Sequence, residues 1–340
     1  MTVELYDARH DPEPPGYREF QRGERLTAAW SYDVMRALSA ATWAPVLLAE
    51  LRDGSRVCGV VSAVYFGLRR GGIPAPRREP LLLDVRVPGY AHCPGWHFAS
   101  WVPPERRREL LRAYERAAVR WLGWGCAGVA YRGVTDDDLP LLARRGAICQ
   151  RSATSGSMPI TWSSVEGWLG SLRKSRRTDL RRQRRIVAAD TELEIDFAPG
   201  RTDLDAETVA RMHRAHVTRL GSRLDPRPPL PAGYFAALYG HQDVLTLSYR
   251  DATGRLLAFG GLLDHPVAPR IGTWAALRPA EGGRKHLYFD HYMRLIHYVI
   301  ERGGRKELSA GQGMFEVKQS LGFHPVPMYR VAIPRWAAGR

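Results

Sequence analysis

The sequence predicts an α/β protein of two domains, each a mixed, mostly antiparallel sheet flanked by helices. Three observations support this prediction. The chain has 340 residues, more than one ordinary domain, and its 44% apolar content is enough for buried cores. Helical and strand-like segments alternate along it, and β-rich runs are joined by glycine-containing turns. The same order of elements occurs twice, which favours two copies of one topology.

The first half begins with residues 1–25, a polar and proline-containing stretch that we expect to be an irregular arm. Residues 28–41 have helical spacing. The β-rich runs 46–51 and 57–66 flank Asp53-Gly54, a strong hairpin signal. Further strands are expected at 81–87, 96–101 and 128–131, and helices at 103–122 and 138–145. This order predicts a mixed domain with an antiparallel start.

The second half repeats this order from a basic helix at residues 169–187 onward. We expect strands at 192–197, 244–249, 256–263, 270–277, 307–310 and 329–333, and helices at 205–220, 234–239, 287–302 and 315–321. The turn Asp251–Gly254 joins a second hairpin closely like the first. Residues 155–164 would close the first copy. The predicted domains are therefore 1–160 and 161–340.

Composition restricts the partners. The net charge is +15 and the sequence pI is about 10.1, so a polyanionic partner is expected: RNA, a nucleotide-bearing substrate or an anionic membrane surface. The start has no basic segment followed by an apolar one, and no run of eighteen apolar residues occurs, so a cytoplasmic protein without a transmembrane segment is expected. The four widely spaced cysteines predict neither a metal site nor a disulfide framework.

The basic helix carries the densest charge in the chain. Residues 173–185 hold eight basic residues and one acid, and seven of the eight are arginine. Arg173, Arg177, Arg181 and Arg185 follow at i+4 steps, so each like-charge pair costs a free helix roughly 0.2–0.5 kcal/mol that an anion would relieve. The fixed fork of arginine suits phosphate. A solvated helix face is the alternative interpretation.

Two glycine-containing loops in the second half are candidate sites. Residues 279–286, Pro-Ala-Glu-Gly-Gly-Arg-Lys-His, open onto a helix, so Gly282, Gly283, Arg284 and Lys285 could form an anion cradle with Arg278 just before them. An ordinary glycine loop with exposed cations is the alternative. The strand at 307–310 runs into Gly311-Gln-Gly313 and then a helix with Glu316 and Lys318. This spacing lacks the third glycine and downstream acid of a dinucleotide fingerprint, and by itself Lys318 could be a surface lysine.

Taken together, these stretches resemble a known family. Residues 172–182, Leu-Arg-Lys-Ser-Arg-Arg-Thr-Asp-Leu-Arg-Arg, are similar to the basic helix that opens the second domain of Fem-like tandem-GNAT acyltransferases. Residues 307–313, with Lys318 and Gly322-Phe-His-Pro, are similar to the closing pattern of that group. The resemblance covers nearly the whole chain. It implies two GNAT-like domains, with 1–160 on the acceptor side and 161–340 for donor binding and catalysis. It also implies a charge-stabilising role for Lys318, and a basic helix that lies along a donor or phosphate-bearing substrate.

One departure from the superfamily bears on the donor. Acetyl-CoA-dependent GNAT enzymes usually carry Q/R-x-x-G-x-G/A after the fourth strand, whereas Arg278 is followed here by Pro-Ala-Glu. Many Fem-like proteins also lack the motif and take an aminoacyl group from tRNA. The resemblance therefore favours aminoacyl-tRNA as co-substrate, with no bound cofactor, over acetyl-CoA or another acyl-CoA.

The shared chemistry of such enzymes indicates which side chains to look for. An amine attacks an ester or thioester carbonyl, the oxyanion needs N–H groups or a cation such as Lys318, and a base must take one proton. Asp290, His291 and Glu316 are the available bases, although Asp290 and His291 could equally be structural. Tyr288 is a donor-binding candidate, although Tyr288, Tyr292 and His297 also fit core spacing.

Three functions remain open from the sequence. The leading one is an aminoacyltransferase that moves an amino acid from aminoacyl-tRNA to an amine-type acceptor, either a peptidoglycan precursor or a small natural product. The second is a CoA-dependent N-acyltransferase of the same fold. The third, from charge alone, is a non-catalytic RNA- or membrane-surface-binding protein.

Overall fold

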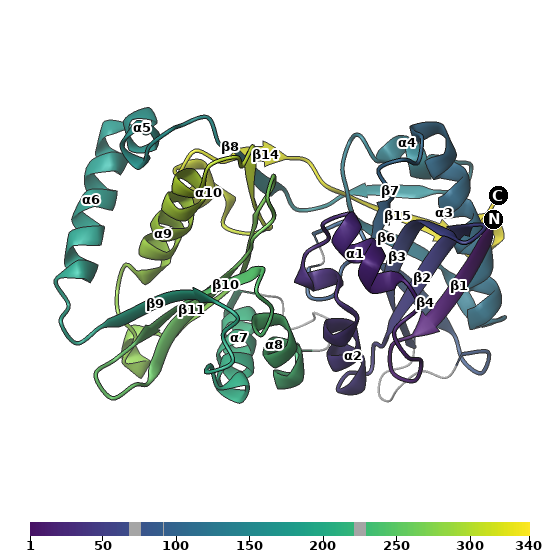
Figure 1. The fold of residues 1–340 in the computed structure, drawn as a ribbon, viewed down its shortest axis with the longest axis horizontal. Helices are drawn as coiled ribbons and strands as arrows, with labels where there is room; N and C mark the ends of the chain where they lie inside the picture. The colour runs from purple at the N-terminus through teal and green to yellow at the C-terminus, as the bar shows by residue number, and fades with distance from the viewer. Residues whose placement is uncertain (68–75, 91, 221–228) are drawn as a thin grey trace. The chain divides into compact units, whose positions relative to one another are not determined.

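A computed structural model describes residues 1–67, 76–90, 92–220 and 229–340 and divides the chain into two compact units. Unit 1 comprises Met1–Ala153, Pro226–Tyr234 and Pro327–Arg340, and unit 2 comprises Thr154–Asp225 and Phe235–Val326. Each unit is built on one mixed sheet (Figure 1). The predicted α/β class is confirmed.

The sheet of unit 1 has the order β1-β2-β3-β4-β6-β15-β7, and β5 pairs with β3. Its strands are β1 (Thr2–Asp7), β2 (Val46–Asp53), β3 (Arg56–Gly67), β4 (Leu81–Val85), β5 (Trp96–Phe98), β6 (Cys126–Val134), β7 (Ile148–Arg151) and β15 (Tyr329–Pro334). Among these residues the β4–β6 pair is parallel and the other pairs are antiparallel. The predicted hairpin forms at Gly54, whose φ of +62° suits glycine.

The core of unit 1 lies between its sheet and α3 (Pro104–Leu122). Leu47, Ala49 and Leu51 alternate along β2 and face the same cluster as Leu111 and Tyr114 of α3. Pro104 lies in the first turn of α3, where its missing N–H costs nothing. The other helices are α1 (Tyr17–Gly23), η1 (Ala28–Trp30), α2 (Tyr32–Ala40), α4 (Leu139–Leu142) and η3 (Arg335–Ala337).

The sheet of unit 2 has the order β14-β8-β13-β12-β11-β10-β9. Its strands are β8 (Ser155–Pro159), β9 (Glu194–Pro199), β10 (Val244–Arg250), β11 (Leu256–Leu263), β12 (Arg270–Ala276), β13 (Glu307–Ala310) and β14 (His324–Val326). Here β12 and β13 form the parallel pair, and α9 (Leu287–Arg302) connects them. Unit 1 uses the same connection, because α3 lies between β4 and β6 in the chain.

Helices cover both faces of the second sheet (Figure 1). Tyr249 on β10 reaches Asp290 on α9, whereas Phe259 on β11 packs against Phe235 of α8 (Ala232–Tyr239) on the opposite face. α7 (Ala206–Leu220) shares the face with α8, and α6 (Lys174–Ala188) packs against α9. The remaining helices are α5 (Val165–Ser171), η2 (Pro279–Glu281) and α10 (Phe315–Gln319).

Two strands lie in the sheet opposite to the one predicted. Residues 155–164 were expected to close the first domain, but β8 pairs with β13 and β14 of unit 2. The last strand, β15, was expected in the second domain, but it pairs with β6 and β7 of unit 1. Val331 and Ile333 of β15 are buried in the unit 1 core, which gives the physical reason. The division at residue 160 is therefore replaced by boundaries after Ala153 and Val326, and Pro226–Tyr234 also belongs to unit 1.

Other segments also differ from the prediction. Residues 1–25 are not an irregular arm, because β1 pairs along β2 and α1 follows it. The basic helix predicted at 169–187 is broken at Leu172 and Arg173 into α5 and α6. β7 and β14 were not predicted. No helix among the described residues is both long enough and apolar enough to span a membrane.

Candidate functional site at the strand fork

The sheet of unit 2 opens between its two parallel strands. β12 and β13 pair only at Arg270↔Ser309 and Ile271↔Ala310. The corresponding pair of unit 1, β4 and β6, pairs along its length from Leu81 to Val85, with one register shift between Leu81 and Leu82. The strands of unit 2 therefore part after Ile271 and Ala310, and we call this point the strand fork. Backbone groups of β12 beyond the fork are not used in a ladder with β13, so a ligand can bind them.

Lys318 lies at the fork. Its Nζ donates to the carbonyl of Gly311, the residue directly after Ala310. The side chain starts on α10 and packs over Gly156 of β8, and only 4% of the residue is exposed. Burial lowers the pKa of the Lys318 ammonium from 10.5 to about 8. The ammonium therefore remains mostly charged at neutral pH, with a neutral fraction that grows near pH 8.

The turn between β13 and α10 shapes the Gly311 side of the fork. Gly313 and Met314 both have left-handed backbones, with φ of +89° and +45°. A left-handed backbone favours glycine and costs a residue such as Met free energy. Gly311 supplies a carbonyl to Lys318, so the predicted Gly-x-Gly pattern positions the lysine at the end of the strand. Glu316 is exposed in the first turn of α10.

A β-bulge lies on the β12 side of the fork. Trp274 pairs with Gly260 and Ile271 pairs with Leu262, so Gly272 and Thr273 together oppose the single residue Gly261. A bulge interrupts the ladder and turns backbone groups in new directions. The fork therefore brings together the buried ammonium of α10 at the end of β13 and the interrupted ladder of β12. An ammonium group can stabilise an oxyanion.

Two aromatic side chains of α9, Tyr288 and His291, pack against Trp274 of β12. The His291 ring packs against Trp274 with centroids 4.6 Å apart, and it occupies the space above Gly260 that a Cβ would fill. Tyr288 contacts Trp274 edge-on at 5.7 Å. His291 is fully buried, its two ring nitrogens have no hydrogen bond among the described residues, and burial lowers its pKa to about 3. It is therefore neutral at physiological pH.

Asp290 is not placed at the fork. Its Oδ2 accepts hydrogen bonds from Tyr249 of β10 at 2.9 Å and from Arg294 Nε at 2.6 Å. β10 is separated from β13 by β11 and β12. Asp290 is also 99% buried, since only 1% of it is exposed. The carboxylate joins α9 to the sheet, so its predicted role as the general base is not supported by the geometry.

The basic helix has a different arrangement from the one predicted. Arg177 donates to the carbonyls of Gly170 at 3.3 Å and Leu172 at 3.5 Å, which satisfies the end of α5. Arg181 forms an ion pair with Glu166. The expected four-arginine face is therefore reduced, because two of its members hold α5 against α6. Arg173 and Arg185 are exposed and have no ion pair among the described residues.

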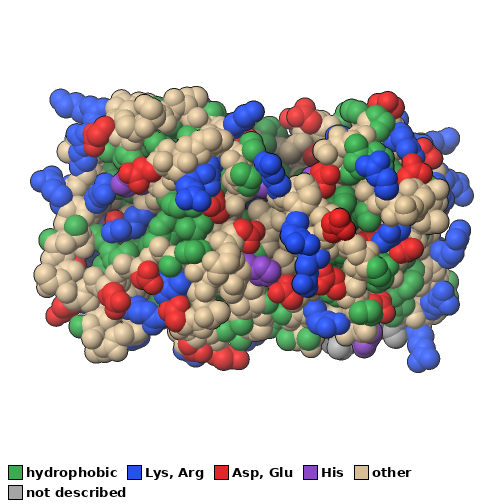
Figure 2. Space-filling view, viewed as in Figure 1, with side chains coloured by type: hydrophobic (Ala, Val, Ile, Leu, Met, Phe, Trp, Pro, Cys, Tyr) green, Lys and Arg blue, Asp and Glu red, His purple; other side chains and the backbone are tan. Residues whose placement is uncertain are grey.

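Basic side chains gather along the outer edge of unit 2 where α6 lies (Figure 2). Lys174 and Arg184 are exposed there alongside Arg173 and Arg185. The side chain of Arg176 instead points inward and lies 4.1 Å from the centroid of the Phe289 ring on α9. Burial lowers the pKa of Arg176. Arg176 was not predicted to point inward, although it lies four residues before Leu180 and so on the apolar face of the helix.

Three amides of the anion cradle predicted at residues 279–286 are already engaged. The amides of Glu281, Gly282 and Gly283 donate to carbonyls within the loop, at 2.8, 3.1 and 2.9 Å. Gly283 is required because a Cβ there would overlap the carbonyl of Leu277. The amides are therefore not free for an anion.

The cations of this loop are mostly paired. Arg284 bonds Asp190 at 3.1 Å and Glu192 at 2.9 Å, and Arg278 bonds Glu281 at 3.0 Å. These carboxylates lie beside arginines that the sequence analysis assigned to a donor. Lys285 is exposed and forms no ion pair within the described ranges. The loop thus supplies one open cation rather than the three predicted.

The bulge and Trp274 are further features that the sequence analysis missed. Gly260-Gly261 inside a strand-like run was a signal for them, since glycine within a strand often marks a bulge or a close approach. Gly260 leaves space for the His291 ring, and Gly261 lies opposite the bulge. These residues connect β11, β12 and α9 around the fork.

The doubled arrangement of a mixed sheet, with a helix linking its parallel strands, defines the structural class. Solved structures with a similar fold include a Fem protein and a tandem GNAT protein. FemX matches with a TM-score of 0.59 at 11% identity, over 97% of this chain and 97% of that chain. L-PGS from Bacillus licheniformis matches with a TM-score of 0.58 at 11% identity, over 97% and 98%.

A tandem GNAT protein from the clavulanic acid biosynthesis pathway, solved without AcCoA, has a TM-score of 0.54 at 13% identity. The match covers 98% of this chain and 99% of that chain. No protein-family model matches the sequence, and no curated protein matches it. These structural likenesses establish a shared fold and confirm the fold prediction.

Proposed function

We propose that this chain is an acyltransferase that moves an aminoacyl group from aminoacyl-tRNA to an amine-type acceptor. The single observation that carries the proposal is the strand fork, where Lys318 and the Gly272-Thr273 bulge flank the point at which β12 and β13 separate. The fold shared with FemX and L-PGS agrees with it. The acceptor would be a peptidoglycan precursor or a small natural product.

The reaction makes one bond and breaks one. The acceptor nitrogen bonds to the aminoacyl carbonyl carbon, and the ester bond to the tRNA ribose breaks. The amine loses a proton, and the departing ribose oxygen gains one. Between these events the carbonyl oxygen carries negative charge, which the Lys318 ammonium and the backbone donors of the bulge would stabilise.

Fewer side chains can act as the general base than the sequence suggested. Asp290 is occupied by Tyr249 and Arg294, and His291 lies fully buried under the sheet. Glu316 is exposed, and it lies on the same short helix as Lys318. We therefore assign Lys318 to charge stabilisation and retain Glu316 as the candidate that would take the proton, directly or through water.

The assignment of aminoacyl-tRNA as the donor rests on the exposed basic side chains of α6. Arg173, Lys174, Arg184 and Arg185 are exposed and form no ion pair with a described residue. If each met one phosphate of single-stranded RNA, the slope of log affinity against log salt would be roughly −3. Lys285 would add to this charge from the loop before α9.

The deciding experiment supplies donors separately. The protein is incubated with an amine-containing cell extract and either total charged tRNA or a panel of acyl-CoA thioesters, and products are read by mass. We expect product with charged tRNA, loss of product after RNase treatment, and a steep fall between about 50 and 200 mM salt. Product from acyl-CoA alone would instead support the CoA-dependent alternative. The fold shared with the tandem GNAT protein is compatible with that alternative.

Two variants separate catalysis from donor binding. Lys318→Ala should lower kcat by on the order of 10²-fold or more, as for loss of an oxyanion donor, while tRNA binding persists. The double reversal Arg173→Glu/Arg185→Glu should raise donor KM by about tenfold or more and leave kcat largely unchanged. The matched control is Arg120→Glu, at an exposed arginine of α3 in unit 1. If Lys318→Ala left product formation intact, the charge-stabilising role of Lys318 would be wrong. If the unchanged protein bound RNA but formed no product with either donor, a non-catalytic RNA-binding function would replace this proposal.

A further inference from the structure

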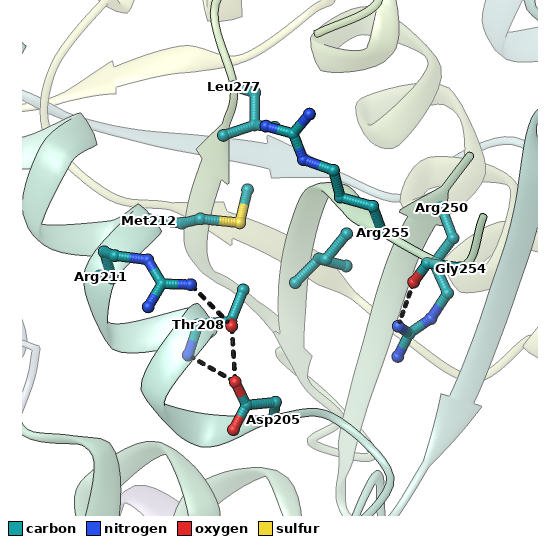
Figure 3. A pocket seen from close by; sticks show the side chains of 9 residues that line it. Asp205, Thr208, Arg211, Met212, Arg250, Gly254, Arg255 and Leu277 are labelled. Atoms are coloured by element: carbon teal, nitrogen blue, oxygen red, sulfur yellow. Dashed lines mark hydrogen bonds between the residues drawn. The ribbon is translucent and has the colours of Figure 1, made fainter. Parts of the chain in front are cut away.

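A separate pocket of about 340 Å³ lies on the α7 face of unit 2. α7, the turn between β10 and β11, and the residue that follows β12 line it (Figure 3). Its apolar part is formed by Met212, Leu256 and Leu277, of which Met212 and Leu256 are buried. No residue assigned above to the strand fork lines this pocket. Its volume is within the range of small-ligand sites, roughly 300–1,000 Å³.

Two guanidinium groups border the apolar part from different elements (Figure 3). Arg211 comes from α7, and its Nη2 donates to Thr208 Oγ1 at 2.9 Å. Arg255 comes from the hairpin turn, and its Nη2 donates to the carbonyl of Glu281 at 3.0 Å. Neither forms an ion pair with a described carboxylate. Each bond uses one N–H and fixes the guanidinium, so the remaining donors are held in place for an anion.

The third arginine of the pocket is engaged elsewhere. Arg250 donates to the carbonyl of Gly254 at 3.0 Å and pairs with Asp203 at 3.5 Å. The one acid in the lining, Asp205, accepts hydrogen bonds from the Thr208 amide and hydroxyl. In Figure 3 it lies at the end of the pocket away from Arg255 and Leu277. The pocket therefore has Arg255 next to its apolar part, and Arg211 next to Thr208, which links it to the carboxylate of Asp205.

We propose that this pocket binds an organic phosphate of the mononucleotide class. The phosphate lies between Arg211 and Arg255, whose forks bind phosphate oxygens in pairs. The base lies against the apolar side chains of Met212, Leu256 and Leu277. The proposal does not depend on the acyl-transfer reaction, because the pocket shares no residue with the strand fork.

The test is calorimetric titration of the full chain with adenosine monophosphate, adenosine and inorganic phosphate. We expect the nucleotide to bind at least about tenfold more tightly than either part alone, because only the nucleotide fills both parts of the pocket. Arg211→Ala and Arg255→Ala should each weaken binding by about tenfold or more, and Arg211→Lys should lie between, since it keeps the charge and loses the fork. A trinucleotide RNA tests the source of the phosphate. Tighter binding than the mononucleotide would assign the pocket to a nucleotide unit of RNA, and equal or weaker binding would assign it to a free nucleotide.

The controls exclude general attraction to a basic protein. Arg120→Ala on α3 removes an exposed arginine elsewhere and should leave nucleotide affinity within about twofold of the unchanged protein. Arg211 and Arg255 are themselves exposed, so their variants should retain the circular dichroism spectrum and unfolding midpoint. No nucleotide binding at millimolar concentration, or unchanged affinity in Arg211→Ala/Arg255→Ala, would overturn the proposal.

Discussion

At the scale of single residues, Lys318 combines burial with a single identified acceptor. Its folded-state pKa of about 8 is below the ordinary value of 10.5, so the native state binds fewer protons than the unfolded chain between these pH values. Stability from this group therefore rises as pH increases from 8 to 10.5. The full cost of burying the charge is present below pH 8 and is absent above 10.5. The shift corresponds to about 3 kcal/mol.

This predicts how Lys318→Met should behave in urea unfolding. The free energy of unfolding of the variant relative to the unchanged protein should fall by about 3 kcal/mol between about pH 7 and pH 10.5, because only the unchanged protein loses the burial cost. Lys174→Met, at an exposed lysine of α6, controls for loss of a positive charge. A difference between Lys318→Met and the unchanged protein that stays constant over this range would contradict the burial of the ammonium.

Sequence reasoning found Lys318 but misjudged several charged neighbours. Asp290, Arg177, Arg181 and Arg284 were candidates because their charge and spacing fit a site. Their partners are Tyr249 and Arg294, the end of α5, Glu166, and the acids that follow α6. Asp290 and Arg284 meet partners more than forty residues away in the chain. A one-dimensional pattern cannot show whether such a charge is already neutralised within the fold.

At the scale of secondary-structure elements, α9 fits β11 because Gly260 leaves space for His291. A Cβ at position 260 would overlap Nε2 of a ring that is fully buried against Trp274. Gly260→Ala should therefore lower the free energy of unfolding by about 1–3 kcal/mol, as overpacking of a core does. Gly170→Ala is the matched control, since its Cβ would meet nothing within 4 Å and should be neutral or slightly stabilising. Denaturant unfolding of both variants tests this.

The double variant Gly260→Ala/His291→Ala isolates the cause. If the overlap with the ring is what destabilises Gly260→Ala, the second change should make the glycine substitution nearly neutral when measured in the His291→Ala background. Equal costs of Gly260→Ala in both backgrounds would show that the strand itself requires glycine. The cycle also tests whether α9 is seated on β11 through this contact.

Most elements were predictable because their periodicity was strong. The helices α3 and α9 and the two hairpins β2–β3 and β10–β11 lie where the sequence placed them. β1 was missed although Val3 and Leu5 alternate with polar residues, because the prolines that follow dominated the interpretation. The break between α5 and α6 was missed because its residues, Leu172 and Arg173, are not helix breakers.

At the scale of the whole molecule, the repeated order of elements correctly predicted two similar units but not the exchange of strands between them. The sequence pattern predicted a strand at β15 and assigned residues 155–164 to the first copy, but such a pattern does not show which sheet a strand joins. Nearness in sequence suggested the wrong sheet for both. In the structure, β15 pairs with β6 on one side and β7 on the other, so a segment from the end of the chain lies inside the first sheet.

This topology predicts that unit 1 cannot complete its sheet without residues 327–340. In a chain that ends at Val326, β6 and β7 would lose their common partner, and the core would lose Val331 and Ile333. Loss of two buried aliphatic side chains costs about 3–6 kcal/mol by burial alone, which is comparable to the stability of a whole domain. We therefore expect the truncated chain to lose cooperative unfolding of unit 1, measured by tryptophan fluorescence and circular dichroism.

A synthetic peptide of residues 327–340 provides the decisive comparison. Added in trans to the truncated chain, it should restore the cooperative transition in a concentration-dependent manner, because binding only to the folded form stabilises that form by mass action. A peptide in which Val331 and Ile333 are both replaced by Asp should not restore it, since these side chains enter the core. A truncated chain that unfolds with the same midpoint and cooperativity as the full chain would show that unit 1 is complete without β15.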